Sequence, residues 1–293
     1  MANAAPHEQA QLLLKQINPE SWPICIDQLP EGTALVGGAV RDAFLGRHSQ
    51  HPDLDLVVPS DALRHTARLA KTFGGKRVVL DEQRDIARLV LKGWTIDLAR
   101  QEGHCLEDDL WRRDYSLNAI ALPLRPLAPL CDPTGGIDDL KRGRLRAVRE
   151  QNLIDDPLRL LRGLRLLAEI PLVLDTETGE WIQRHRQALV ESAPERILAE
   201  LQRLVKGTHA DHSLDLLKRW QLLQPWGTTP QTLSKHDTTL LHAAEVAVAL
   251  PLARLTNLIS DDGLKRLRAS KVLQQRCARL RHCLLYTSPS PRD

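Results

Sequence analysis

The feature that most constrains this chain is a pair of glycines followed closely by two aspartates that are one residue apart. The apolar stretch Ala34–Val36 runs directly into Gly37 and Gly38. Asp53 and Asp55 then begin a second apolar stretch, Asp-Leu-Asp-Leu-Val-Val. We expect both stretches to be short strands, with a glycine turn between the first strand and a helix. This order places a tight turn in front of two carboxylates.

The two aspartates predict a metal site. Successive side chains of a strand alternate between its faces, so Asp53 and Asp55 project from the same side while Leu54 faces the core. Two neighbouring carboxylates repel each other, which is unfavourable unless a cation neutralises the pair. Hard oxygen ligands suit Mg²⁺. The pattern favours metal-dependent nucleotidyl transfer.

The glycine turn predicts a phosphate site. We expect a helix over residues 39–45, which begins where Gly37 and Gly38 end. Glycines let a ligand approach the backbone closely, and the free N–H groups at a helix N-terminus can hold phosphate oxygens. Asp42 has a structural alternative, as a first-turn acid that the helix dipole favours. The glycine pair and the aspartate pair are each weak signals alone. Their order and proximity in the sequence support the interpretation as a nucleotidyl-transfer site.

Composition limits the class of protein. A chain of 293 residues with 42% hydrophobic residues can bury the cores of two ordinary domains. Its net charge of +3 is too small to indicate nucleic-acid binding by itself. The cysteines have no zinc-site spacing, which fits reduced thiols in a cytoplasmic protein. No apolar run predicts a membrane span or a secretory signal.

With further motifs, the chain resembles class II tRNA nucleotidyltransferases and bacterial poly(A) polymerases, which add nucleotides to RNA 3′ ends. The motifs follow one another in the family's order over about residues 30–205. They are Gly37–Asp42, Asp53–Val58, Arg112–Ala119, Asp132–Leu140, Asp155–Arg162 and Glu195–Leu201. The resemblance implies an enzyme that binds the 3′ acceptor end of tRNA and uses CTP and ATP with Mg²⁺.

The resemblance also implies roles for the residues first singled out. Asp53 and Asp55 would be catalytic carboxylates that bind the metal. Gly37, Gly38 and Arg41 would bind the triphosphate of the incoming nucleotide. Two metal ions in polymerase-like sites activate the attacking 3′-hydroxyl and steady the leaving pyrophosphate.

Asp97 is a candidate third catalytic carboxylate. It lies in an expected strand over residues 94–98, where it would join Asp53 and Asp55. The alternative is a surface aspartate on an edge strand. Some relatives that the head resembles lack an acid at this place.

The segment Arg112–Ala119 supplies further candidates for nucleotide binding. Arg113, Asp114 and Asn118 would share one helical turn if the segment is helical, because residues i and i+4 lie on one face. The resemblance implies that they contact the sugar and phosphates of the nucleotide. The structural alternative makes Asp114 an N-cap and Arg113 a surface cation.

Asp156 and Pro157 have two interpretations. An aspartate before a proline is a standard helix start, with the aspartate as N-cap. The resemblance implies instead that Asp156 and Arg159 read the nucleobase by hydrogen bonds, and that Arg162 also binds the nucleotide. A carboxylate accepts from the exocyclic amine of C and A, while an arginine donates to a ring acceptor, so the pair can reject G and U. The preceding acid is Asp155, where the family has a glutamate.

Two other patterns have local interpretations. Five cations fall within residues 141–149, and both a solvated face and a phosphate-contacting surface are compatible with them. Ser192 and Glu195 match a capping box, with Pro194 in the first turn of a helix.

The resemblance and the hydrophobic patterns together predict an α+β fold, in which a small mixed-sheet nucleotidyltransferase head precedes an all-helical neck and a partial body. Helices are expected over 7–17, 61–72 and 105–112, strands over 78–80, 87–91 and 94–98, and no strand from 157 on. The expected division is an N-terminal helical segment 1–30, the catalytic head 31–148, the neck 149–206 with the nucleotide-selecting motif, the body 207–285 and a tail 286–293. We expect the body to be truncated and the Ser-Pro tail to be non-native.

The resemblance leaves the added nucleotides open among CC, A and CCA. Only 16 residues separate Asp97 from Asp114, and this short loop favours the CC-adding branch. A poly(A) polymerase is the nearest alternative, but Gly75-Lys76-Arg77 is followed by Val78 and lacks that subgroup's Gly-basic-basic-Phe signature. A catalytically silent RNA-binding homologue is an alternative of a different class.

Overall fold

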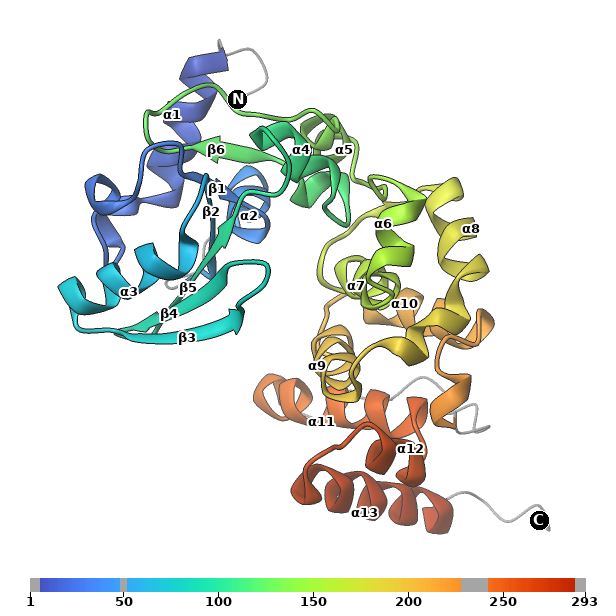
Figure 1. The fold of residues 1–293 in the computed structure, drawn as a ribbon. Helices are drawn as coiled ribbons and strands as arrows, with labels where there is room; N and C mark the ends of the chain where they lie inside the picture. Colours follow the sequence, from blue (N-terminus) through green and yellow to red (C-terminus); the bar gives the residue numbers. More distant parts are fainter. Residues whose placement is uncertain (1–5, 48–51, 228–241, 288–293) are drawn as a thin grey trace. The chain divides into compact units, whose positions relative to one another are not determined.

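The computed structural model describes residues 6–47, 52–227 and 242–287 (Figure 1). It divides the chain into two compact units, Met1–Arg149 and Glu150–Asp293. The finer boundaries expected at residues 30, 206 and 285 stay predictions. Of the expected tail 286–293, residues 288–293 lie outside the described part. Within the described residues, no helix combines the length and apolarity that crossing a membrane requires.

The first unit is built on one six-stranded sheet in the order β3-β4-β5-β2-β1-β6. The parallel pair is β2 and β5, and the other neighbours are antiparallel. The mixed sheet that the sequence predicts is therefore confirmed. The strands are β1 (Ala34–Val36), β2 (Leu54–Val58), β3 (Lys76–Asp81), β4 (Ile86–Leu91), β5 (Trp94–Arg100) and β6 (Ala121–Pro123).

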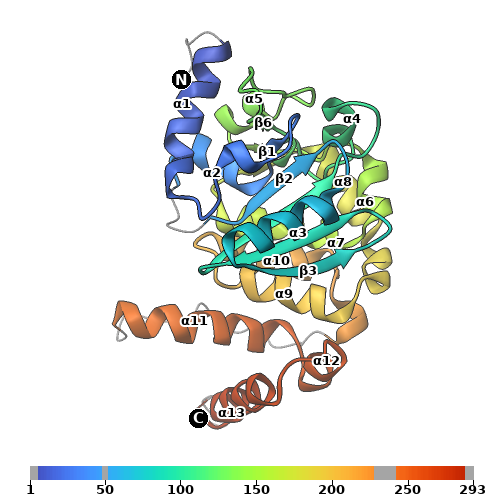
Figure 2. The same cartoon turned by 60° about the vertical axis from the view of Figure 1, so that its left-hand side comes forward.

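The first unit also contains helices. They are α1 (Pro6–Ile17), α2 (Gly38–Phe44), α3 (Ala62–Phe73), α4 (Leu106–Trp111) and α5 (Gly136–Lys141), and a two-residue strand, β7 (Arg144–Leu145), follows them. Helix α3 packs on β3, β4 and β5 (Figure 2). Its buried residues Ala62, Thr66 and Leu69 follow the spacing of one helix face. The helices and strands expected in this half of the chain are confirmed to within a few residues.

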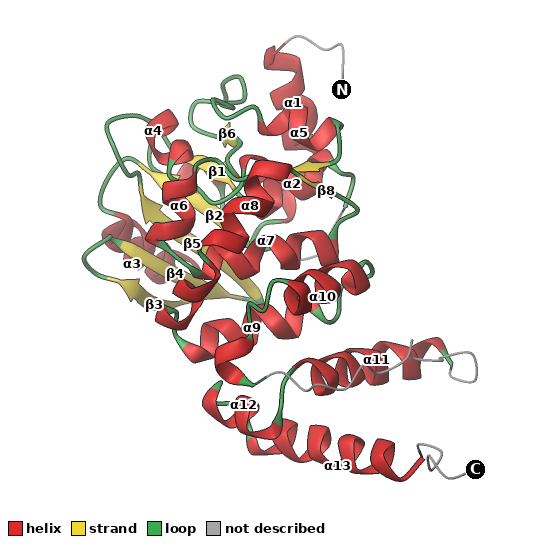
Figure 3. Cartoon of the chain, turned by 90° about the vertical axis from the view of Figure 1, so that its right-hand side faces the viewer, coloured by secondary structure: helices red, strands yellow, loops and turns green. Residues whose placement is uncertain are grey.

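The second unit is helical. Its helices are α6 (Glu150–Asp155), α7 (Leu158–Glu169), α8 (Thr176–Arg184), α9 (Pro194–Leu204), α10 (Ala210–Arg219), α11 (Ala243–Leu258), α12 (Asp261–Arg266) and α13 (Lys271–Thr287). Helix α7 packs against α9 and α10 (Figure 3), and its Leu160, Leu161 and Leu164 are fully buried. The leucine periodicity of this half therefore reflects a packed helical core.

Two local predictions for the second unit are wrong. A short strand, β8 (Val173–Leu174), interrupts the helices. Pro171 keeps Ile170 extended, and the β-branched Val173 follows. The capping box is also absent, because α9 begins at Pro194 and Glu195 instead forms an ion pair with Arg268 at 2.6 Å.

Candidate active site

The glycine turn lies against one of the paired carboxylates. Gly37 has a φ of +73° and α2 begins at the next residue. Strand β1 pairs with β2 so that Val36 lies opposite Asp55. A Cβ atom on Gly37 would lie only 2.8 Å from Oδ2 of Asp55. Glycine is therefore required here both by the backbone conformation and by the nearby carboxylate.

The two aspartates differ in exposure. Asp53 is exposed and directly precedes β2, while Asp55 is half-buried within that strand. Leu54 and Leu56, on either side of Asp55, are buried, as the alternation of a strand requires. The geometry agrees with the prediction that the leucines face the core.

Asp97 lies beside Asp55 on the neighbouring strand. In the parallel pair of β2 and β5, Asp55 is directly opposite Asp97. Strand β4 lies on the other side of β5 and places Arg88 opposite Asp97. The Nε and Nη2 atoms of Arg88 donate to the two carboxylate oxygens of Asp97, at 2.8 Å each. These hydrogen bonds raise the pKa of Arg88, and the negative charges of Asp97, Asp53 and Asp55 raise it further. The cluster thus places one arginine among three carboxylates.

The donor chemistry of this cluster fits a hard divalent cation. Asp53 and Asp55 offer carboxylate oxygens at an accessible edge beside the glycine turn. In the described part of the chain, no group of three or more His, Cys, Asp or Glu side chains is placed to hold a metal ion. Both oxygens of Asp97 accept hydrogen bonds from Arg88, so its assignment as a third ligand stays a prediction.

Arg41, a predicted triphosphate ligand, is buried and has two protein partners. Its Nη1 donates to Oδ1 of Asn118 at 2.7 Å. Its Nε and Nη2 donate to the two oxygens of Asp42 at 2.9 and 3.0 Å. Arg41 therefore holds α2 against the 3₁₀ turn Ser116–Asn118, directly after the glycine turn.

Arg113, Asp114 and Asn118 do not share one helical turn, because the segment that holds them is not one continuous helix. Helix α4 ends at Trp111, and Tyr115 is extended before the 3₁₀ turn begins. The cause is the side chain of Asp114, whose Oδ1 accepts from the Tyr115 N–H at 2.7 Å and from Asn118 Nδ2 at 3.1 Å. Such local bonds compete with the helical backbone pattern.

The structure nevertheless brings most of these candidates together. Asn118 bonds both Arg41 and Asp114, so the three form one connected buried group. Arg113 pairs with Asp109 at 3.0 Å.

The basic run 141–149 is largely a local ion-pair network. Asp139 is fully buried and accepts from Arg144 Nε at 2.6 Å, Arg146 Nε at 2.9 Å and Ser116 Oγ at 2.6 Å. Arg149 lies over the ring of Trp111, 4.7 Å from its centroid. The central cations of the run thus bind protein partners. Sequence reasoning did not single out Asp139, although it lies in the motif Asp132–Leu140 directly before them.

In the second unit, Asp156 contributes to the start of α7. Its Oδ1 accepts from the Leu158 N–H at 3.3 Å, and its Oδ2 pairs with Arg196 at 3.1 Å. Arg159 donates to the Asn152 carbonyl at 3.0 Å. Asp156 thus acts as a capping acceptor, with Arg159 one helical turn away.

The arginines further along α7 differ in burial. Arg162 lies 3.9 Å from Glu200 and keeps 41% of its side chain exposed. Arg165 is only 3% exposed and pairs with Glu200 at 2.7 Å and Glu169 at 3.1 Å. Burial lowers the pKa of Arg165. Arg162 is therefore the more accessible of the two.

Family models match both halves of the chain. The model of the "Poly A polymerase head domain" covers residues 33–146. A second model, described as "Probable RNA and SrmB- binding site of polymerase A", covers residues 172–228.

Among curated relatives, the CC-adding tRNA nucleotidyltransferase of Synechocystis sp. is 37% identical over 260 residues, which are 87% of this chain and 62% of the relative. The CC-adding enzyme of Thermus thermophilus is 40% identical and the A-adding enzyme of Deinococcus radiodurans is 38% identical, each over 66% of this chain and 44% of the relative. The chain therefore spans less than two thirds of the length of these relatives.

Solved structures share the fold. A CCA-adding enzyme in complex with ATP has a TM-score of 0.70 at 23% identity, over 95% of this chain and 76% of that one. A Thermotoga maritima CCA-adding enzyme complexed with tRNA has a TM-score of 0.72 at 24% identity, over 93% and 72%. The chain therefore shares the fold of these enzymes.

Proposed function

The chain belongs to the class II tRNA nucleotidyltransferase and poly(A) polymerase family, and we propose that it adds C, A or both to the 3′ end of tRNA without a template. The observation that supports this proposal is the close approach of the glycine turn to Asp55, since a Cβ atom on Gly37 would lie 2.8 Å from Oδ2 of Asp55. CTP and ATP are the proposed nucleotide substrates. The Synechocystis and Thermus relatives favour CC addition.

The proposed cofactor is a divalent cation, specifically Mg²⁺, held by Asp53 and Asp55. When bound, such an ion supplies Lewis-acid activation of the RNA 3′-hydroxyl and neutralises charge on the triphosphate. Asp97, opposite Asp55 on the neighbouring strand, would be held in place by its two hydrogen bonds from Arg88. The chain's own contribution is a fixed set of carboxylates.

The glycine turn and the buried polar group next to it would position the nucleotide. Gly37 is buried against Asp55 and Gly38 is partly exposed, so the triphosphate would approach the backbone at Gly38, which carries no side chain of its own. Arg41 fixes the start of α2 to Asn118 at 2.7 Å, so the turn keeps its shape. Arg113, whose side chain is 24% exposed, would contact the sugar or the phosphates.

Base selection is assigned to Asp156 and Arg159, with Arg162 as an additional nucleotide ligand. Asp156 lies at the start of α7 and keeps 30% of its side chain exposed. A carboxylate accepts from the amine that C and A carry, and G and U do not present that group in the same place. The pair would therefore act as an amino-acid template.

The partner is the acceptor end of tRNA, and we propose a cytoplasmic location for the reaction. The cysteines whose side chains are described, Cys25, Cys105, Cys131 and Cys277, are all free thiols. Free thiols fit a reducing compartment.

End-labelling separates the possible activities. A tRNA transcript without its CCA end is incubated with CTP, with ATP and with both, and a second transcript that ends in CC is treated in parallel. A CC-adding enzyme extends the first transcript by two nucleotides with CTP and leaves the second unchanged. Long ATP-dependent tails would identify a poly(A) polymerase. Calorimetric CTP binding without any incorporation would identify a silent homologue and reject the proposal.

A further inference from the structure

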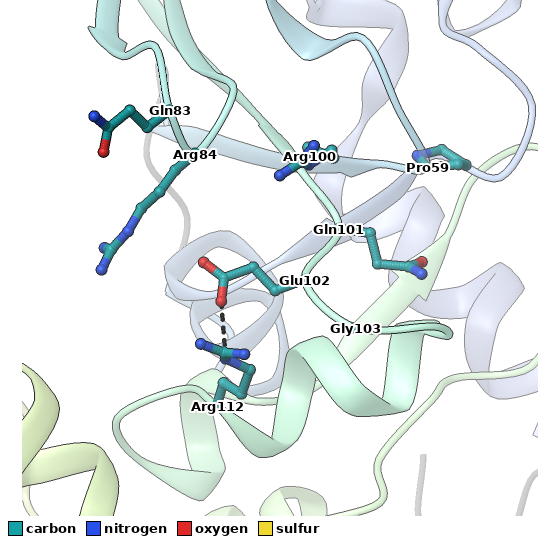
Figure 4. Close-up of a pocket in the computed structure, with 8 residues that line it drawn as sticks. All are labelled: Pro59, Gln83, Arg84, Arg100, Gln101, Glu102, Gly103 and Arg112. Atoms are coloured by element: carbon teal, nitrogen blue, oxygen red, sulfur yellow. Dashed lines mark ion pairs between the residues drawn. The ribbon is translucent and has the colours of Figure 1, made fainter.

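A polar pocket of about 430 Å³ lies in the first unit where strands β2 and β5 end (Figure 4). The residues that line it are Pro59, Gln83, Arg84, Arg100, Gln101, Glu102, Gly103 and Arg112. Three are arginines and one is acidic, so the lining carries a net positive charge. None of the candidate nucleotide-binding or metal-binding residues belongs to it.

Backbone hydrogen bonds fix the walls of this pocket. The Gln101 N–H donates to the carbonyl of Val58 at 2.7 Å, and the Arg100 N–H donates to the carbonyl of Asp85 at 3.0 Å. The Glu102 N–H donates to Oδ1 of Asp109 at 3.1 Å. The pocket is therefore a built feature of the strand ends rather than the surface of a loose loop.

The pocket is separate from the proposed catalytic site. It begins at Pro59, four residues after Asp55, which is about 13 Å along an extended strand. On β5, Arg100 follows Asp97 by three residues, so the two side chains leave the sheet on opposite faces. A ligand in the pocket is therefore not the nucleotide held at the carboxylates.

The three arginines differ in how far protein partners neutralise them. Arg112 pairs with Glu102 at 2.8 Å, as the dashed line in Figure 4 shows. Arg84 lies 4.0 Å from Asp81, at the limit of an ion pair, and keeps 69% of its side chain exposed. In the described part of the chain, Arg100 has no side-chain hydrogen bond or ion pair, and it is exposed. Its guanidinium is available to an anion.

The lining also indicates the class of anion. Small-molecule sites are mostly apolar or aromatic, whereas this pocket has no aromatic residue on which a base could stack. Arginine guanidinium groups bind phosphate oxygens with two parallel hydrogen bonds, and Gln83 and Gln101 add amide donors. We infer that the pocket binds a backbone phosphate of the RNA substrate, an inference that rests on the proposed function.

The test measures RNA affinity, CTP affinity and incorporation on the full chain. The variant Arg100→Gln is expected to bind a tRNA transcript without CCA about fivefold more weakly, the upper end for one exposed ion pair. The dependence of log affinity on log salt is expected to become shallower by about one. CTP affinity without RNA and the melting temperature should stay unchanged, because Arg100 has no protein partner to lose.

Two further variants make the result specific. Arg142→Gln removes an arginine that directly follows α5 and is 65% exposed, close to the 64% of Arg112. It should leave the salt dependence of RNA binding unchanged. Glu102→Gln removes the one acid of the pocket and releases Arg112, so it should tighten RNA binding. A merely structural role for the pocket does not predict tighter binding.

The outcomes separate this inference from the proposed function. An Arg100→Gln variant with unchanged RNA affinity and salt dependence overturns the inference, even where the wild type incorporates CTP normally. Equal losses of RNA affinity in Arg100→Gln and Arg142→Gln overturn it as well, because the loss then reflects the net charge of the protein and not the pocket. Weaker CTP binding without RNA makes the pocket a nucleotide subsite and also overturns it. A wild type that binds RNA but incorporates nothing rejects the proposed function alone.

Discussion

Asp55 and Asp97 lie directly opposite each other on the parallel strands β2 and β5. Arg88, opposite Asp97 on β4, donates to both of its carboxylate oxygens at 2.8 Å. The strand order thus places the cation Arg88 beside the carboxylates of Asp55 and Asp97 in the absence of a metal ion. The charges of Asp53 and Asp55 also reach Arg88, since they help to raise its pKa.

Replacing Arg88 should change the affinity for Mg²⁺. In Arg88→Gln the carboxylates lose their neighbouring cation, so Mg²⁺ should bind several-fold more tightly in the absence of nucleotide. Arg88→Lys keeps the charge and should stay close to the wild type. Calorimetric titration with MgCl₂ measures the affinity. Unchanged or weaker binding in Arg88→Gln would show that Arg88 does not set the charge of this site.

Removing one charge of the carboxylate pair should abolish catalysis without unfolding the protein. Asp55→Asn should lower nucleotide incorporation by at least about a hundredfold, because loss of a metal ligand removes several kcal/mol of transition-state stabilisation. Asp138→Asn is a matched control, since Asp138 is 54% exposed on α5 and pairs only with a surface arginine in the described contacts. Near-normal incorporation by a folded Asp55→Asn would contradict the assignment.

Gly37 should be intolerant of even a methyl group. Gly37→Ala adds a Cβ 2.8 Å from Asp55 Oδ2 and forces a residue with a side chain to adopt a φ of +73°. Gly46→Ala is the control, because Gly46 has a similar φ of +65° and nothing within 4 Å of an added Cβ. Gly46→Ala should lose about 1–2 kcal/mol of stability from backbone strain in urea unfolding. Gly37→Ala should lose more, because its ψ of −138° lies outside the left-handed helical region and its Cβ meets Asp55. Only Gly37→Ala should lose most of its nucleotide incorporation. Equal incorporation by the two variants would show that the contact between Gly37 and Asp55 is not needed for activity.

Local patterns predicted the fold well where a few consecutive residues determine the structure. The side-chain alternation around Asp55 depends only on neighbouring residues in the sequence, and so does the glycine turn at the start of α2. The structure contains both. The condition of a helix through Asp114 is not met, because its carboxylate accepts from the Tyr115 N–H and from Asn118. The role of Asp139 depends on residues up to 23 positions away, such as Ser116, and periodicity does not show such pairs.

The same limit applies to the candidate site. The sequence alone points to Asp53 and Asp55, because two aspartates separated by one residue are visible without a structure. Arg88 was missed, because its relation to Asp97 depends on the pairing of β4 with β5. The expected strands over residues 87–91 and 94–98 were the available signal, but their pairing and register would have been needed as well.

Asp156 provides the last prediction, because the structure separates its structural role from its proposed role in base selection. Asp156→Asn keeps a capping oxygen for the Leu158 N–H and loses only the charge that pairs with Arg196, an ion pair exposed at both ends. Its melting temperature should therefore change little. Selection of CTP and ATP over UTP and GTP should relax, because an amide presents a donor where the carboxylate only accepts. Arg196→Gln breaks the same ion pair but leaves the carboxylate, so it should keep selectivity. If both variants discriminate like the wild type in competition assays with all four nucleotides, Asp156 caps α7 and does not read the base.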